Sequence, residues 1–198
     1  MDLFNTNSIE NILPFEGEVL NYGLVLDSNL SAHYFNTFLK DDFWKHDELI
    51  MFGNHLKTNR KVAWFGDQDY QYSNSIKKAL TWTTELISLK EIIELKTGEK
   101  FNSCLLNLYH NGNEGMGWHS DNEKELGEHP VIASLSLGSA RKFLLKHNQT
   151  KQKIAIILES GSLLLMKGET QEKWIHSLPK TKIIQKPRIN LTFRFIHS

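Results

Sequence analysis

A strictly alternating stretch near the end of the chain, residues 187–196, constrains the fold more than any other feature. Its apolar residues fall on one side of a period-two pattern and its polar residues on the other. Such alternation predicts a half-buried β-strand. The polar side combines two guanidiniums, an amide and a hydroxyl, from Arg188, Asn190, Thr192 and Arg194. This row is either the solvent-facing side of a sheet or the wall of an anion site, because guanidinium binds carboxylate through paired hydrogen bonds.

The chain after residue 100 is predicted to be a series of short strands separated by turn signals. We expect these strands at 101–110, 131–137, 141–147, 154–158, 162–166, 173–177 and 188–197. Seven short strands at this spacing are typical of a β-sandwich or of a double-sheet jelly roll, also called a double-stranded β-helix. The sequence therefore predicts one α+β domain over residues 1–198. Residues 101–198 would form its core, and residues 1–100 an N-terminal extension packed on that core.

The N-terminal extension is predicted to be a mixed layer of helices and strands. Apolar spacing indicates helices at 29–40 and 84–97, with Ser28 and Thr84 as their N-caps and Gly98 as the stop of the second. Strands are expected at 19–26 and 62–65, and the polar, basic residues 53–61 are expected to form a loop.

Composition bounds the setting of the chain. The 23 basic and 23 acidic residues balance, so binding to nucleic acid would depend on a local patch. Cys104 is the only cysteine, which excludes an internal disulfide and favours a reducing, intracellular setting. The sequence indicates neither a membrane span nor a signal peptide. We expect a monomer in the cytoplasm, associated with the nucleoid, or in the nucleus of a eukaryote.

A candidate metal site is indicated by His119, Asp121 and His176. Residues at i and i+2 of an extended segment share a face, so His119 and Asp121 can approach one ion from a glycine-containing loop. His176 lies on a predicted strand about 55 residues later. Two histidines and one carboxylate leave three coordination positions open, a set that suits non-haem Fe(II) oxygenases, although zinc could use the same ligands.

The order of these pieces resembles the AlkB family of Fe(II)- and 2-oxoglutarate-dependent nucleic-acid dealkylases. The matching segments are Asn107-Leu108-Tyr109, His119-Ser120-Asp121, Trp174-Ile175-His176 and residues 188–194. The likeness runs from about residue 52 to the end of the chain. It implies a jelly roll that uses Fe(II), 2-oxoglutarate and O2 to remove alkyl groups from bases in DNA, with RNA as a further candidate. Succinate, CO2 and an aldehyde would be released.

The resemblance also assigns roles to individual residues near the metal. It implies that His119, Asp121 and His176 hold Fe(II). The distal carboxylate of 2-oxoglutarate would be bound by Arg188, with Tyr109 and Asn190. The carboxylate next to the keto group would be bound by Arg194 and Asn107, with Thr192 nearby. A dianion needs two cationic anchors placed apart, which agrees with this assignment.

For the substrate, the resemblance implies a base flipped out of the helix. Tyr72 would stack on it opposite His119, Tyr70 would hydrogen-bond to it, and Glu123 would read its exocyclic edge. Phe52 would fill the gap in the duplex. Basic side chains would contact phosphates, among them Arg60, Lys57, Lys61, Arg141, Lys142 and Lys146. Asn122 departs from the acidic residue expected there.

Two other hypotheses remain open from the sequence. One keeps the Fe(II)/2-oxoglutarate chemistry and makes the substrate a protein or a small molecule, which the neutral net charge favours. The other is a non-catalytic β-sandwich binding module whose histidines are structural. Arg188 and Arg194 argue against a binding module, because it has no need for a buried dicarboxylate clamp.

Overall fold

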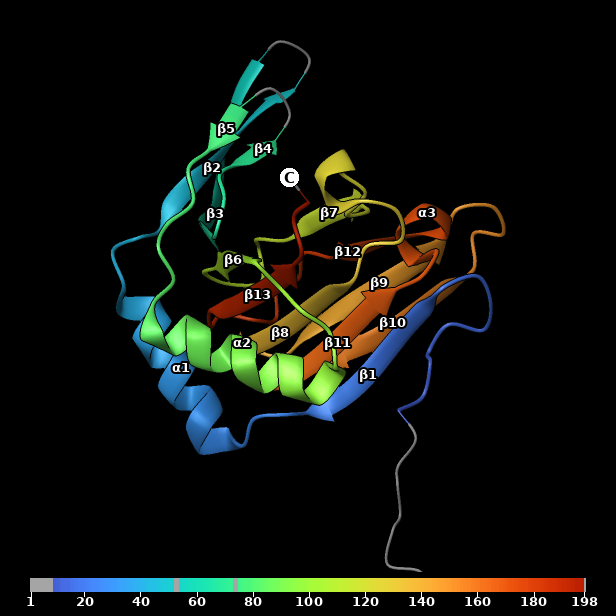
Figure 1. Cartoon of the computed structure of the whole chain (residues 1–198), viewed down its shortest axis with the longest axis horizontal. Helices are drawn as coiled ribbons and strands as arrows, with labels where there is room; N and C mark the ends of the chain where they lie inside the picture. The colour runs from blue at the N-terminus through green and yellow to red at the C-terminus, as the bar shows by residue number, and fades with distance from the viewer. Residues whose placement is uncertain (1–8, 52–53, 73–74, 198) are drawn as a thin grey trace, which may run out of the picture.

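Two antiparallel sheets form the body of the chain, in a computed structural model that describes residues 9–51, 54–72 and 75–197 (Figure 1). The large sheet contains β1 (Glu18–Leu24), β11 (Ser162–Lys167), β8 (Ile132–Gly138), β13 (Arg188–Arg194), β6 (Ser103–Tyr109), β3 (Asn54–Gly66) and β2 (Lys45–Met51), in that order. The small sheet contains β10 (Lys153–Leu158), β9 (Arg141–His147), β12 (Trp174–Leu178) and β7 (Met116–His119). This arrangement confirms the predicted double-sheet jelly roll.

The remaining elements cover or extend the two sheets. Helices α1 (Ser28–Lys40) and α2 (Thr84–Thr97) share one apolar core with the large sheet. A short hairpin pairs β4 (Tyr70–Tyr72) with β5 (Ser75–Lys77), and α3 (Thr170–Lys173) leads directly into β12. Within the described ranges, no helix combines the length and apolar character needed to cross a membrane.

Strand β13 occupies the middle of the large sheet, between β8 and β6. Its alternating residues are divided between two layers. Ile189, Leu191 and Phe193 are fully buried in the core that α1 and α2 cover. Its polar residues face the other way and line a cavity between the sheets: Arg188, Asn190, Thr192 and Arg194. The polar row is therefore an internal wall, not a solvent-facing surface.

The N-terminal half contributes strands to the large sheet, and one prediction there is wrong. Residues 54–66 form the single strand β3, where the sequence suggested a loop at 53–61 followed by a short strand. Strand β3 pairs with β2 on one side and with β6 on the other. Backbone pairing of residues 54–62 with β2 gives these polar residues hydrogen bonds that their composition does not reveal. The β2–β3 and β4–β5 strands project from the body on the same side (Figure 1).

Both predicted helices are present, but each N-cap lies one residue earlier than predicted. The Asp27 carboxylate accepts a hydrogen bond from the Leu30 backbone N–H at 2.8 Å, and the Thr83 hydroxyl accepts one from the Leu86 N–H at 3.3 Å. Because Ser, Thr and Asp all serve as caps, the sequence alone could not choose between adjacent candidates. Gly98 ends α2 in the left-handed conformation, with φ of +74°.

The cap assignment of α2 predicts a difference between two adjacent threonines. Thr83→Ala should lower the free energy of unfolding by about 1 kcal/mol, because an orphan N–H of the first turn loses its partner. Thr84→Ala, at the first helical position, should change it by less than about 0.5 kcal/mol. Urea unfolding followed by circular dichroism measures both, and equal losses would contradict the assignment.

Candidate active site

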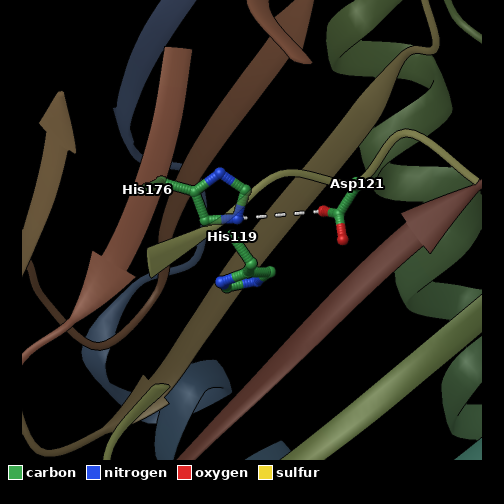
Figure 2. Close-up of side chains that lie close together, drawn as sticks. All are labelled: His119, Asp121 and His176. Atoms are coloured by element: carbon green, nitrogen blue, oxygen red, sulfur yellow. Dashed lines mark ion pairs between the residues drawn. The ribbon is translucent and has the colours of Figure 1, made fainter. Parts of the chain in front are cut away.

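Three side chains from two segments lie close together, as Figure 2 shows, and all three line the cavity. Strand β7 pairs with β12 so that His119 lies directly opposite His176, and the two imidazole centroids are 4.3 Å apart. Asp121 follows β7 by two residues. One ligand atom from each of the three residues lies within 4.8 Å of the others, and His176 Nε2 is 4.0 Å from Asp121 Oδ2. The sequence predicted a loop before His119, whereas Met116–His119 form an edge strand.

Hydrogen bonds around the triad fix which atoms can bind an ion. His119 Nδ1 lies 2.9 Å from the Gly117 carbonyl oxygen and donates to it, which leaves Nε2 for a metal. The backbone N–H of Asp121 donates to Gln171 Oε1 at 2.9 Å, and Arg194 Nη2 donates to Asp121 Oδ1 at 2.6 Å. Asp121 Oδ2 remains directed toward His176. The donor set therefore fits an ion held by two histidines and one carboxylate oxygen.

The protonation states of the buried ligands also fit a cation. Burial lowers the pKa of His176 to about 4, so its imidazole is neutral at neutral pH. Burial raises the pKa of Asp121, but Arg194 and the two histidines lower that pKa by more, and it ends below its usual range. Metal ligands must be deprotonated, so both side chains are in the form that binds.

A buried cation lies in the wall of the same cavity, which has a volume of about 170 Å³. Arg188 is only 2% exposed. Its Nη2 donates to the Ser136 hydroxyl at 2.9 Å and to Asn190 Oδ1 at 2.6 Å, both neutral acceptors, and its Nε has no partner among the described residues. Burial lowers its pKa to about 10, which leaves it protonated at neutral pH. A buried charge without a counter-charge is costly, so this site fits an anionic ligand.

The other predicted cosubstrate residues also line the cavity. Asn107 lies opposite Asn190 across the β6–β13 pair, and its buried Oδ1 has no partner in the described part of the chain. Asn190 Nδ2 donates to the Thr192 hydroxyl at 2.9 Å. Tyr109 lies opposite Arg188 in the same strand pair. Arg194 pairs with Asp121, so it contacts the metal site directly.

Two of the predicted substrate residues line the cavity. Glu123 lines the cavity, and its buried Oε2 has no partner in the ranges that the structure covers. Arg60 also lines the cavity, from β3 and not from a loop, and its Nη1 donates to the Met116 sulfur at 3.2 Å. Tyr70 and Tyr72 are the first and last residues of β4. Phe52 lies outside the described residues.

Sequence reasoning missed several residues of the site and misplaced another. Seven apolar side chains complete the cavity wall: Val62, Trp64, Leu105, Met116, Phe143, Met166 and Leu178. Gln171, on α3, is 2% exposed and binds the Asp121 backbone. Nothing in the sequence around Gln171 distinguishes it from a surface residue. Arg141 was expected to contact phosphates, but it is 2% exposed and binds backbone carbonyls, so that expectation is wrong.

A jelly roll that places two histidines and one carboxylate beside a buried cation is the arrangement of a non-haem iron oxygenase. The profile of the 2OG-Fe(II) oxygenase superfamily matches residues 19–194 of this chain, so the chain belongs to that superfamily. The cofactors of the superfamily are Fe(II) and 2-oxoglutarate, with O2 as the oxidant.

The curated relatives confirm the resemblance to the AlkB family. The chain is 40% identical over 164 residues to human alpha-ketoglutarate-dependent dioxygenase alkB homolog 3, covering 78% of this chain and 57% of the relative. It is 38% identical to the bovine protein of that name, covering 82% of this chain and 60% of the relative. It is 36% identical to human DNA oxidative demethylase ALKBH2, over 74% and 60%. The chain thus spans less than two thirds of these relatives.

A solved structure shares the fold at low sequence identity. The structure of OsALKBH1 aligns with a TM-score of 0.64 at 15% identity, covering 92% of this chain and 98% of that one. Family membership favours the two oxygenase hypotheses over the binding module.

The ligand assignment predicts that two substitutions both weaken metal binding but differ in their effect on the stability of the metal-free protein. His119→Ala and Asp121→Ala should each weaken Fe(II) binding by at least about 100-fold. Only Asp121→Ala should also destabilise the metal-free fold, by about 3 kcal/mol, because it leaves the Arg194 guanidinium buried without its carboxylate. Anaerobic calorimetry measures binding and urea titration measures stability.

The exposed carboxylate of Glu128 provides the control, since Glu128→Ala removes a charge from the same loop without touching the triad. It should bind Fe(II) as the unmodified protein does. Unchanged Fe(II) affinity in His119→Ala would contradict the assignment of the ligands.

Proposed function

We propose that this chain is an oxidative demethylase of N-alkylated bases in DNA, with RNA as a further substrate. The observation that carries the proposal is that one cavity contains the triad, the buried Arg188 cation and the Glu123 carboxylate, and that Arg188 Nε and Glu123 Oε2 have no hydrogen-bond partner among the described residues. The first two fit a metal and a dicarboxylate, and the third fits a hydrogen-bond donor on a substrate. The names of the relatives, which include DNA oxidative demethylase, support the same conclusion.

On the cosubstrate side, the residues of the cavity wall bind and orient a dianion. Arg188 would bind the distal carboxylate of 2-oxoglutarate with Tyr109, while Asn190 holds the guanidinium in place. Asn107, which lies opposite Asn190, and Arg194 would hold the carboxylate next to the keto group, with Thr192 beside them. Arg194 would do so while also holding Asp121. Apolar side chains on the opposite wall, such as Phe143 and Leu178, exclude water.

On the substrate side, the alkylated base must leave its stack to reach the cavity. The Glu123 carboxylate would accept a hydrogen bond from an exocyclic amino group, which adenine and cytosine carry and thymine does not. Tyr72 and the His119 ring would stack on the two faces of the base, and Tyr70 would hydrogen-bond to it. Arg60 would contact the nucleic acid at the cavity, and Phe52 would fill the gap in a duplex.

When bound, Fe(II) with 2-oxoglutarate and O2 supplies the oxidation, which yields succinate, CO2 and a hydroxylated N-alkyl carbon that breaks down to an aldehyde and the unmodified base. The protein residues supply position, charge and exclusion of water. Such a substrate would place the chain with the DNA of the cell, in the cytoplasm associated with the nucleoid, or in the nucleus of a eukaryote. We also propose that it acts as a monomer, because a single chain supplies all the residues named for this cavity.

The proposal predicts that turnover depends on a methylated base. The protein with Fe(II), ascorbate and 2-oxoglutarate should release succinate much faster with an oligonucleotide that carries one N-methylated adenine or cytosine than with its unmethylated twin. Mass spectrometry of the succinate and of the digested oligonucleotide measures both products, and one methyl group should be lost per coupled turnover. His176→Ala should release no succinate.

Glu123→Ala serves as the matched substrate variant. It should raise the KM for the methylated oligonucleotide about tenfold, the scale of one hydrogen bond to a base edge, and leave the KM for 2-oxoglutarate unchanged. If the rate of succinate release does not depend on the oligonucleotide, the proposal is overturned. That result would favour the hypothesis of a hydroxylase that acts on proteins or small molecules.

A further inference from the structure

Two buried guanidiniums lie against the ring of Tyr109, and only one of them lines the cavity. The guanidinium carbon of Arg188 is 5.7 Å from the centroid of the ring, and that of Arg141 is 6.0 Å from it. Both distances are within the range of cation–π attraction. Arg141, the first residue of β9, is as deeply buried as Arg188, at 2% exposed, but it does not reach the cavity wall.

Arg141 holds together the segments that flank the site. Its Nη2 donates to the carbonyl oxygens of Glu114 and Pro179, both at 2.9 Å, and its Nη1 donates to that of Asn111 at 3.4 Å. Asn111 and Glu114 lie in the turn that joins Tyr109 to β7, and Pro179 directly follows β12. One guanidinium therefore fixes the exits of the two strands that carry Tyr109 and His176.

Burial lowers the pKa of Arg141, and Tyr109 and the Glu114 carboxylate offset part of that shift, so the charge of Arg141 is only partly compensated. Its hydrogen-bond acceptors in the described ranges are carbonyl oxygens. The neighbouring Glu114 carboxylate accepts instead from the His110 backbone N–H, at 2.9 Å. Burial lowers the pKa of Arg188, and the Arg141 charge lowers it further, so the two cations repel one another. A carboxylate bound at Arg188 and Tyr109 would be attracted by both, since a charge acts over several ångströms in a protein interior.

We propose that Arg141 is a positioning residue that sets the affinity of the cavity for the distal carboxylate of its 2-oxo acid, by holding Tyr109 in place and by adding a second positive charge behind Arg188. The inference rests on the proposed function, which supplies 2-oxoglutarate as the acid. It makes Arg141 part of the selection for a dicarboxylate over a monocarboxylate, without direct contact with the ligand.

The test compares two ligands that differ only in the distal group. Calorimetry of the Fe(II)-loaded protein without O2 measures the Kd of 2-oxoglutarate and of 2-oxopentanoate, which has the same five-carbon chain but no distal carboxylate. In Arg141→Met, the Kd of 2-oxoglutarate should rise about tenfold, the scale of one lost charge in a partly screened interior. The Kd of 2-oxopentanoate should stay unchanged, so the ratio of the Kd of 2-oxopentanoate to the Kd of 2-oxoglutarate falls about tenfold.

A purely structural role gives a different result, because a loosened site weakens both ligands equally and leaves the ratio unchanged; that outcome overturns the inference. Lys153→Met is the matched control, because it removes one exposed cation from the neighbouring strand β10, and it should keep the ratio of the unmodified protein.

Arg141→Lys decides the question if Arg141→Met does not fold. Lysine keeps the charge but loses the planar fork that binds several carbonyls, so the ratio should fall about threefold. If Arg141→Lys has the same ratio as the unmodified protein, the inference is overturned. If the unmodified protein binds 2-oxoglutarate no better than 2-oxopentanoate, the proposed function itself fails, which separates the two outcomes.

Discussion

Burial of two guanidiniums on one face of β13 is the constraint on which the rest of the structure depends. Arg188 and Arg194 are 2% and 5% exposed, and an arginine cannot give up its charge to reduce the cost of burial. Arg194 is compensated by Asp121, at 2.6 Å. Arg188 has hydroxyl and amide partners alone in the described ranges, and the ring of Tyr109 beside it. The fold thus keeps one cation neutralised by a metal ligand and the other available to an anion.

The pairing of β7 with β12 brings together the two histidines of the metal site. These two strands come from parts of the chain more than fifty residues apart, and their register places His119 opposite His176. Gln171, on the short helix that precedes β12, then binds the backbone of Asp121. The Asp121 carboxylate is consequently held from two sides, by Gln171 through its backbone and by Arg194 through its side chain. A site with this support reaches its ligand geometry before any ion arrives.

How much could be predicted from the sequence depended on whether the signal was local. The alternation of residues 188–194 is local and strong, and it predicted a strand whose polar side could bind an anion. The spacing of His119, Asp121 and His176 predicted a group that the structure does bring together. The strand β7 was missed, because its few residues include Gly117 and gain their strand conformation only by pairing with β12. The length of β3 was missed because its polar residues gain their strand conformation by pairing with β2. Gln171 and Arg141 carried no recognisable signal, because their importance comes from contacts with backbone groups distant in sequence.

The central claim is that the triad and Arg188 bind one metal ion and one dicarboxylate side by side. The most direct measurement is an anaerobic titration of the Fe(II)-loaded protein with 2-oxoglutarate, followed by the visible charge-transfer absorption that arises when a 2-oxo acid chelates ferrous iron. The account predicts a band that saturates at one 2-oxoglutarate per chain, requires His176, and needs at least about tenfold more 2-oxoglutarate in Arg188→Met, which loses the bidentate cation. Absence of the band, or an unchanged titration in Arg188→Met, would contradict it.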